Sequence, residues 1–199
     1  MVFIQVSMEV LGNLLKDTSP IRQEKNHIYF YAEVDRDTIR TLIESLRECE
    51  DYCLRTKRLM NLKKLPIYLH INSYGGCIFS ALNAIDYIEA CEVPVYTIIE
   101  GSTASAGTLI SVCGKKRYIR PNAHMLIHQL SSECWGKMSE IEDEVSNLKS
   151  IMVKLKTIYK DHTLIPKKEL KRLLKHDLWL NSEQCLEYGL ADELWMNKN

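Results

Sequence analysis

Hydrophobic positions along the chain follow two periods, one typical of strands and one typical of helices. Residues 27–34 (HIYFYAEV), 65–72 (LPIYLHIN) and 93–100 (VPVYTIIE) are rich in β-branched and aromatic side chains, and each is predicted to form a strand. Two segments between them place apolar side chains on one helical face: Ile39, Leu42, Ile43, Leu46 and Cys49 in the first, and Ile78, Leu82, Ile85 and Ile88 in the second. Strands separated by helices predict a layered α/β domain built from βαβ units.

The first helix is predicted over residues 35–53, with Asp37 as its N-cap. The basic segment 54–64 (LRTKRLMNLKK) is expected to connect that helix to the next strand. A longer helix is predicted from Ser139, where Ser139 and Glu142 have the spacing of a capping box. Its apolar positions are Ile141, Val145, Leu148, Met152, Leu155 and Tyr159. Their repeat of about 3.5 residues suits either an ordinary core-facing helix or a projecting helix that packs against another subunit.

Composition narrows the class of protein. The 199 residues fit one domain, or one domain with a small extension, and Lys+Arg and Asp+Glu balance at 26 each, which gives no sign of a nucleic-acid partner. Seven cysteines without framework spacing favour free thiols in a reducing compartment. Cys49 and Cys53 have helical spacing, but no second ligand pair follows at zinc-finger spacing, so we favour packing over metal binding. The N-terminus has no basic leader and no run of about 18 apolar residues exists, so we expect a soluble, unsecreted protein without membrane partners.

Candidate chemistry centres on residues 95–111 (VYTIIEGSTASAGTLIS), where small residues surround Ser105. A serine hydroxyl becomes a good nucleophile when a base takes its proton, and a third group commonly orients that base. Six histidines are candidates for the base: His27, His70, His124, His128, His162 and His176. His128 is expected at a strand end and His162 at a helix C-terminus, but spacing alone does not choose between them.

Backbone donors are the second requirement for acyl chemistry. Position 103 is Thr, so the G-x-S-x-G nucleophile elbow of α/β-hydrolases is absent. Ser105 lies between a predicted strand and a predicted helix, so the N–H of Ala106 can point outward at the helix start. Gly75-Gly76 also lies between a strand and a helix and can supply a second donor. The alternative is that the glycines form only a turn and the small residues only tight packing.

Four sequence blocks resemble the proteolytic subunit of the Clp protease (ClpP) family over roughly residues 27–195. They are YLHINSYGG, GSTASAG, RYIRPNAHMLIHQ and HDLWLNSEQCLEYGLADEL, in that order. The resemblance implies that Ser105 is the nucleophile, His128 the general base and acid, and Asp177 the orienting carboxylate. It implies Gly76 and Ala106 as the backbone donors of an oxyanion hole, and neither a metal nor an organic cofactor.

The resemblance also implies a ClpP/crotonase-like layered domain over residues 27–199, with a projecting handle helix at about 139–161, after an N-terminal segment 1–26 that matches poorly. Family members assemble into two stacked seven-membered rings that enclose a chamber. We therefore expect a homo-oligomer that cleaves unfolded polypeptides delivered by an AAA+ unfoldase, with ATP used by that partner. The expected location is the cytoplasm or an organellar matrix or stroma.

Several positions depart from the family pattern. Tyr74 and Leu130 replace prolines that are usual in the family, and the segment from Cys53 to Lys64 resembles an insertion relative to the family pattern. His176 stands where an arginine commonly forms an ion pair across the ring interface, so ring pairing is expected to be weaker or sensitive to pH. Two alternative functions remain: a non-catalytic scaffold subunit of a mixed ring, and a crotonase-type acyl-CoA enzyme. A scaffold subunit would normally lack one of the three residues Ser105, His128 and Asp177. An acyl-CoA enzyme would not need all three of them together.

Overall fold

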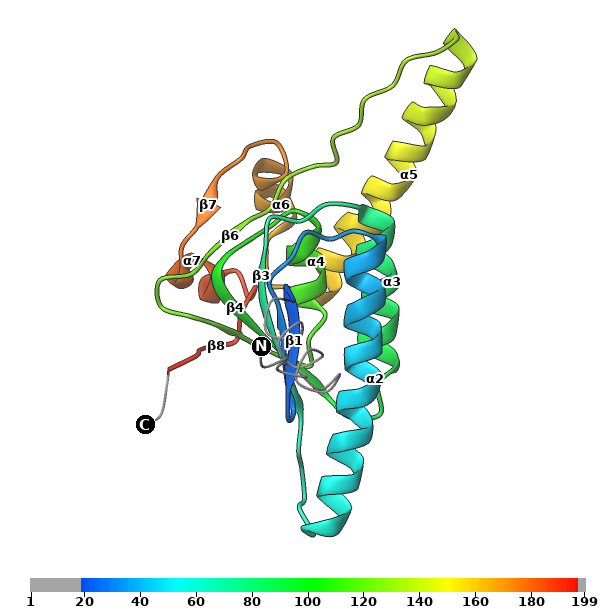
Figure 1. Cartoon of the computed structure of the whole chain (residues 1–199). Coiled ribbons are helices and arrows are strands. Elements are labelled where there is room, and N and C mark those ends of the chain that lie inside the picture. Colours follow the sequence, from blue (N-terminus) through cyan, green and yellow to red (C-terminus); the bar gives the residue numbers. More distant parts are fainter. Residues whose placement is uncertain (1–18, 197–199) are drawn as a thin grey trace, which may run out of the picture.

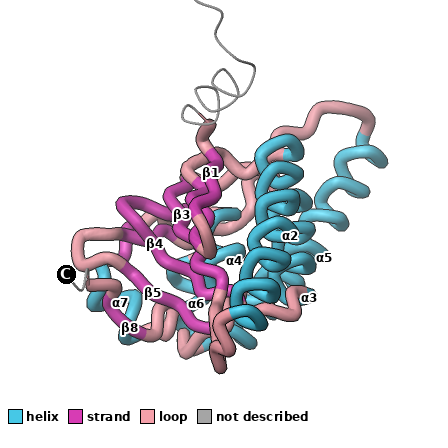
Figure 2. Tube along the Cα trace, turned by 60° about the horizontal axis from the view of Figure 1, so that its bottom comes forward, coloured by secondary structure: helices cyan, strands magenta, loops and turns pink. Residues whose placement is uncertain are grey.

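A computed structural model of the chain describes residues 19–196, so most of the N-terminal segment expected at 1–26 lies outside the described residues. Within that range the chain forms a sheet with helices α2, α3 and α5 on one side of it and α4 between these helices and the strands (Figures 1 and 2). The predicted α/β class is confirmed. The division at residue 26 stays a prediction, and strand β1 (Ile21–Glu24) already belongs to the sheet.

The described strands form one sheet with the order β1-β2-β3-β4-β5-β8. Strand β1 is antiparallel to β2, and β2, β3, β4, β5 and β8 run parallel to one another. Strand β6 pairs in parallel with the end of β4 and antiparallel with β7. The bounds are β2 His27–Phe30, β3 Ile67–Ser73, β4 Val95–Ala104, β5 Lys116–Ile119, β6 His124–Leu126, β7 Trp179–Leu180 and β8 Glu193–Leu194.

Alternation along β3 shows why this sequence forms a two-sided sheet. Ile67, Leu69 and Ile71 are fully buried in the core. The intervening Tyr68 lies on the other face, where its ring packs near those of Tyr96 and Trp195. Successive side chains of a strand point to opposite faces, so one face of β3 packs in the aliphatic core and the other carries aromatic rings.

Helix α2 (Arg36–Leu59) differs from the prediction at both ends. Asp35, not Asp37, is its N-cap: Asp35 Oδ1 accepts the backbone N–H groups of Asp37 and Thr38, each at 2.8 Å. The helix also continues through half of the expected connector 54–64. That stretch holds no helix breaker, and the basic residues near the end favour the negative pole of the helix.

The other helices are α3 (Ile78–Ala90), α4 (Ala106–Val112), α5 (Met138–His162), α6 (Lys167–Leu173) and α7 (Ser182–Glu187). The predicted capping box of the long helix is wrong, because α5 begins before Ser139. Its first turn is closed by the Glu140 side chain, whose Oε2 accepts the Lys137 N–H at 2.9 Å.

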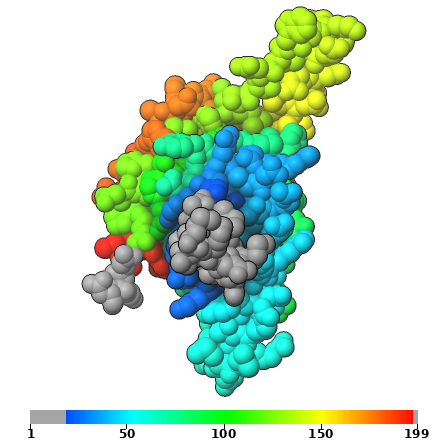
Figure 3. Space-filling model, viewed as in Figure 1, coloured from blue at the N-terminus to red at the C-terminus, as the bar shows by residue number. Residues whose placement is uncertain are grey.

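Helix α5 divides into two parts. Leu155, Ile158 and Tyr159 near its C-terminus are buried in the core. Its N-terminal half projects from the body of the molecule, and Val145 there is 43% exposed (Figures 1 and 3). Trp135, in the loop that leads into α5, is fully exposed. The core-facing interpretation of the apolar repeat therefore describes the C-terminal half; the N-terminal half projects, and its packing against another subunit stays a prediction.

Strand β4 carries an irregularity just before Ser105. Ile71 pairs with Ile99, and Ser73 pairs with Thr103. An advance of two residues along β3 therefore corresponds to an advance of four residues along β4. Gly101 takes the left-handed backbone that this bulge requires, at φ +62°. The bulge changes the direction of β4 and separates the part that pairs with β5 from the part that pairs with β6.

Two predictions from composition concern cysteines and membranes. All seven cysteines are free thiols, and Cys49 and Cys53 are both buried in the core, in agreement with packing. Among residues 19–196, no helix combines the length and apolar character needed to cross a bilayer.

Candidate active site

Ser105 lies at the junction between β4 and α4, where it is the N-cap residue of the helix. Its backbone has φ 53° and ψ −127°, a conformation that a residue with a side chain rarely adopts. Such strain costs on the order of 1–3 kcal/mol and is concentrated at functional sites. The backbone N–H of Ser105 donates to the Leu126 carbonyl at 2.9 Å, which fixes the junction against β6.

Gly75 allows the loop after β3 to approach Ser105 closely. A Cβ at position 75 would lie 2.6 Å from Ser105 Cβ, 2.8 Å from the Ala104 carbonyl oxygen and 2.9 Å from the Ala106 nitrogen. The backbone of Gly75 also has φ +94°. Two of its contacts are with backbone atoms that cannot rotate away, so only glycine fits here. Sequence reasoning had placed the close approach within the pair Gly75-Gly76, and the structure assigns it to Gly75.

The two proposed oxyanion donors lie on either side of this contact. Ala106 is the first residue of α4, and its N–H is one of the donors that a helix leaves without an intrahelical acceptor. Val34 forms a parallel bridge with Gly76, in which the Val34 N–H donates to Gly75 O and the Cys77 N–H donates to Val34 O. In this pattern the N–H of Gly76 itself points away from Val34.

His128 and Asp177 come together from distant parts of the chain. His128 follows β6 by two residues, and Asp177 precedes β7 by two residues. The antiparallel pairing of β6 with β7 aligns the two segments, and His128 Nδ1 lies 3.2 Å from Asp177 Oδ1. The carboxylate therefore holds one ring nitrogen and leaves Nε2 for other partners. The Asp177 side chain is 74% exposed and that of His128 is 30% exposed.

Ser105 and His128 line the same open cavity, of about 620 Å³. Gly75 and Gly76 line it as well, so the five predicted site residues gather around one end of β3 and β4. Within residues 19–196, no hydrogen bond joins Ser105 Oγ to His128. Catalytic hydrogen bonds are often long or poorly aligned before substrate binds.

The sequence is similar to known proteins over most of its length. The family model described as Clp protease matches residues 22–198. A relative from Treponema denticola, named ATP-dependent Clp protease proteolytic subunit 2, is 30% identical over 203 aligned positions, which cover 100% of this chain and 97% of the relative. The chain belongs to the Clp protease family. It is therefore a ClpP-type peptidase homologue, and the resemblance found in the sequence is confirmed.

The structure separates the six histidines of this Clp protease family member. His27 Nδ1 lies 2.9 Å from His70 Nε2 within an aromatic cluster, and His124 is exposed with Nδ1 near the Asn122 carbonyl. His162 faces Glu89, and His176 is exposed. Of the six, His128 alone lines the cavity that contains Ser105. Spacing in the sequence left this choice open because the pairing of β4 with β6 is a non-local contact.

The structure adds two contacts to this Clp protease site, one of them made by Tyr74, which the sequence had marked only as a replacement for proline. Tyr74 is 74% exposed, and its ring meets Trp179 edge to face at 6.4 Å, at one side of the cavity. Tyr31 lines the cavity and donates a hydrogen bond from its hydroxyl to Glu100. No motif joins these residues in the sequence, since they come from four different segments.

Glu100 is held ionised beneath Tyr31. Burial opposes its ionisation, but hydrogen bonds with His70, Tyr31 and Arg120 outweigh that effect and lower the pKa of Glu100 to about 2. Arg120 Nε donates to Glu100 Oε1 at 2.9 Å, and His70 Nδ1 lies 3.1 Å from the same oxygen. This network fixes β2, β3 and β4 to one another just below the bulge at Gly101.

Proposed function

We propose that this protein is a serine endopeptidase that cleaves unfolded polypeptides with Ser105 as nucleophile, His128 as general base and acid, and Asp177 as orienting carboxylate. The observation that carries the proposal is the contact between His128 Nδ1 and Asp177 Oδ1 at 3.2 Å, on the wall of the cavity where Ser105 lies at a strained strand-to-helix junction. Neither alternative function needs all three groups at one place.

The proposed reaction uses only groups of this chain. Asp177 fixes the His128 tautomer with the proton on Nδ1, so Nε2 accepts the proton of Ser105 as Oγ attacks the peptide carbonyl. The negative charge that develops on the carbonyl oxygen is stabilised by the N–H groups of Ala106 and Gly76. His128 then protonates the leaving amine, and water hydrolyses the acyl-enzyme by the same route. No metal or organic cofactor takes part.

We also propose that the chain works in a ring assembly. Two apolar side chains on the projecting half of α5 are exposed: Met138 is 71% exposed and Val145 is 43% exposed. A facing subunit with the same helix would bury them, as expected for stacked heptameric rings. Substrates would be unfolded polypeptides, delivered by an AAA+ unfoldase that uses ATP.

His176 offers a test of the assembly. It is exposed beside Asp177, at the position expected to face a neighbouring ring, and its sensitivity to pH stays a prediction. Sedimentation velocity between about pH 5.5 and 8 would measure it. An unchanged distribution of assembled and free particles over this range would remove the idea.

Covalent labelling tests the nucleophile. An active-site fluorophosphonate should label the wild-type chain at Ser105, and the Ser105→Ala variant should not be labelled while its particle size is retained. Ser132→Ala is the matched control, because Ser132 is exposed and its hydroxyl donates to Glu144. A wild-type particle of assembled size that resists labelling would favour the scaffold subunit. Turnover of an acyl-CoA thioester by Ser105→Ala would favour the crotonase-type enzyme.

A further inference from the structure

A second cavity, of about 630 Å³, lies at the opposite end of α4 from Ser105. The C-terminal ends of three helices line it: α3 through Glu89, α4 through Cys113 and α5 through His162. The C-terminus of a helix carries partial negative charge from carbonyl groups without intrahelical donors. Three such ends around one cavity favour a positively charged ligand.

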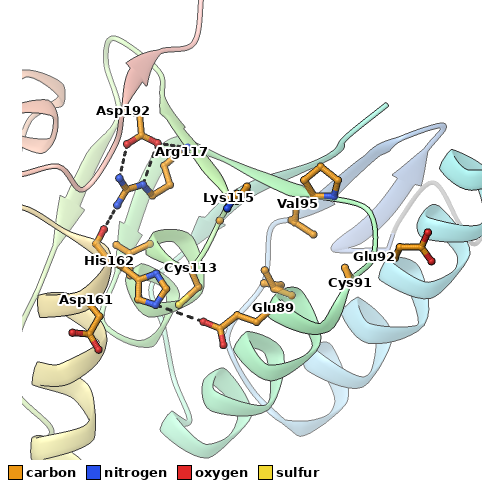
Figure 4. Close-up of a pocket in the computed structure, with 14 residues that line it drawn as sticks. Glu89, Cys91, Glu92, Val95, Cys113, Lys115, Arg117, Asp161, His162 and Asp192 are labelled. Atoms are coloured by element: carbon orange, nitrogen blue, oxygen red, sulfur yellow. Dashed lines mark hydrogen bonds and ion pairs between the residues drawn. The ribbon is translucent and has the colours of Figure 1, made fainter. Parts of the chain in front are cut away.

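The side chains at these helix ends converge inside the cavity. A carboxylate oxygen of Glu89, Sγ of Cys113 and a ring nitrogen of His162 all lie within 4.8 Å of one another. Figure 4 shows the His162 ring and the Glu89 carboxylate pointing toward each other, with Cys113 beside them. His162 Nε2 lies 3.5 Å from Glu89 Oε1. Within residues 19–196 this is the one group of such side chains with that spacing.

We propose that Glu89, Cys113 and His162 bind a transition-metal dication of the zinc class, with water as the fourth ligand. Thiolate and imidazole select zinc-like ions over Mg²⁺ and Ca²⁺, which prefer oxygen ligands alone. Bond lengths of roughly 2.0–2.3 Å in a tetrahedron place ligand atoms roughly 3.3–3.8 Å apart. The separation of 3.5 Å between His162 and Glu89 already fits that geometry.

Burial differs among the three ligands in a way that suits such a site. Cys113 is 7% exposed, while the side chains of His162 and Glu89 are 31% and 50% exposed. The thiolate is therefore held in place by packing, and Glu89 is free to move the short distance that coordination requires. The open side of the cavity gives an ion and its water a path to the site.

The backbone around His162 is anchored independently of the metal. Arg117 donates from its guanidinium to the His162 carbonyl and to the Asp192 carboxylate (Figure 4). The backbone N–H of Arg117 also donates to Asp192, at 2.8 Å. These contacts fix the end of α5 against β5, so the imidazole is positioned before the metal arrives.

Metal binding must displace a proton from Cys113. Burial, with a contribution from Glu89 and against the opposing effect of Arg117 and Lys154, raises the pKa of the Cys113 thiol to about 12. The thiol is therefore protonated in the metal-free protein at neutral pH, and the metal-bound form carries a thiolate.

Titration of the full-length, metal-stripped protein with Zn²⁺ alone tests the site. We expect the wild-type protein to bind one Zn²⁺ per chain. The affinity for Zn²⁺ should fall at least about a hundredfold in Cys113→Ser or His162→Gln and about tenfold in Glu89→Gln. With Co²⁺ as the probe, wild-type protein should show a thiolate-to-metal charge-transfer band, which Cys113→Ser should abolish. The pair His128 and Asp177 cannot give this band, since it offers only nitrogen and oxygen.

Matched controls separate the site from general metal binding. Glu92 lines the same cavity but does not belong to the group of Glu89, Cys113 and His162, and Cys134 is an exposed thiol elsewhere in the chain. Neither Glu92→Gln nor Cys134→Ser should therefore change the affinity for Zn²⁺. Should Cys113→Ser fail to fold, the more exposed His162→Gln and Glu89→Gln carry the same test. Stoichiometric binding that survives His162→Gln, or no stoichiometric binding by the wild type, overturns the proposal. The test is independent of peptidase activity.

Discussion

The two ends of α4 lie in two different cavities and offer opposite chemistry. At the N-terminal end, Ser105 has a strained backbone, Gly75 lies in close contact with it, and the Ala106 N–H begins the helix without an intrahelical acceptor. At the C-terminal end, Cys113 has an ordinary helical backbone and lies among a carboxylate and an imidazole. The comparison places the proposed anion-stabilising groups at the N-terminal end and the proposed cation-binding groups at the C-terminal end of one seven-residue helix, in keeping with the polarity of a helix.

Among substitutions at the two ends of α4, removal of the proposed nucleophile is expected to have the largest effect on activity. Ser105→Ala should lower kcat for a short peptide by on the order of 10⁴–10⁶-fold, because the covalent step disappears and only binding and the oxyanion donors remain. Hydrolysis of a fluorogenic peptide measures it, with Ser132→Ala as the control. A residual rate within tenfold of the wild type would show that the N-terminal end of α4 is not the catalytic end.

The second effect tests the close approach of Gly75 to Ser105. In Gly75→Ala the new methyl group meets backbone atoms of Ala104 and Ala106 at 2.8–2.9 Å, so the loop must shift. A displacement of about 1 Å should lower kcat/KM about a hundredfold. Overpacking should also reduce the free energy of unfolding by about 1–3 kcal/mol.

Gly136→Ala is the control for the peptidase activity of this variant, because Gly136 does not line the cavity that contains Ser105 and its methyl group meets the side chain of Glu140. Peptidase assays and urea denaturation measure the two effects. If Gly75→Ala kept wild-type activity, the close approach would have no catalytic role.

The third effect concerns the link between α4 and α5. Thr108 Oγ1 lies 2.6 Å from Tyr159 Oη, and both residues are buried. Thr108→Val leaves the Tyr159 hydroxyl without this partner and should cost about 1–3 kcal/mol of unfolding free energy. Tyr159→Phe should cost less, about 0.5–1.5 kcal/mol, since the Thr108 hydroxyl keeps its bond to the Ser105 carbonyl at 2.6 Å. Urea denaturation compares the two, and the reverse order would contradict this assignment.

The smallest effect is expected at the C-terminal end without metal. Glu89→Gln removes the contact between the Glu89 carboxylate and His162. Because the Glu89 side chain is half-exposed, the unfolding free energy in the presence of chelator should change by only about 0–1 kcal/mol. Thermal denaturation in the presence of chelator measures it. A loss well above this range would mean that Glu89 supports the fold directly rather than serving as a ligand.

The sequence predicted the features that depend on neighbours in the chain. Strands β3 and β4, helix α3 and the position of Ser105 between a strand and a helix all follow from local periodicity and small residues. The end of α2 was predicted too early, because a basic composition was taken as a sign of a loop although those residues favour a helix C-terminus.

Contacts between distant segments were beyond local reasoning. His128 was distinguished from the other histidines by the pairing of β6 with β4 and β7, which no spacing reveals. The contact of Gly75 with Ser105 depends on how two loops pack, and the group of Glu89, Cys113 and His162 on where three helices end. The resemblance to the family suggested the proposed roles of Ser105, His128 and Asp177, and the fold brings the three residues to one region.

The exposed tip of the projecting helix gives the molecule an optical reporter of its own. Of the three tryptophans, Trp135 is fully exposed just before α5, whereas Trp195 packs against Tyr68 and Tyr118. An indole in water emits at longer wavelength than one in an apolar contact. Coverage of the tip by another subunit would therefore shift the emission of the protein to shorter wavelength, and assembly can be followed without a label.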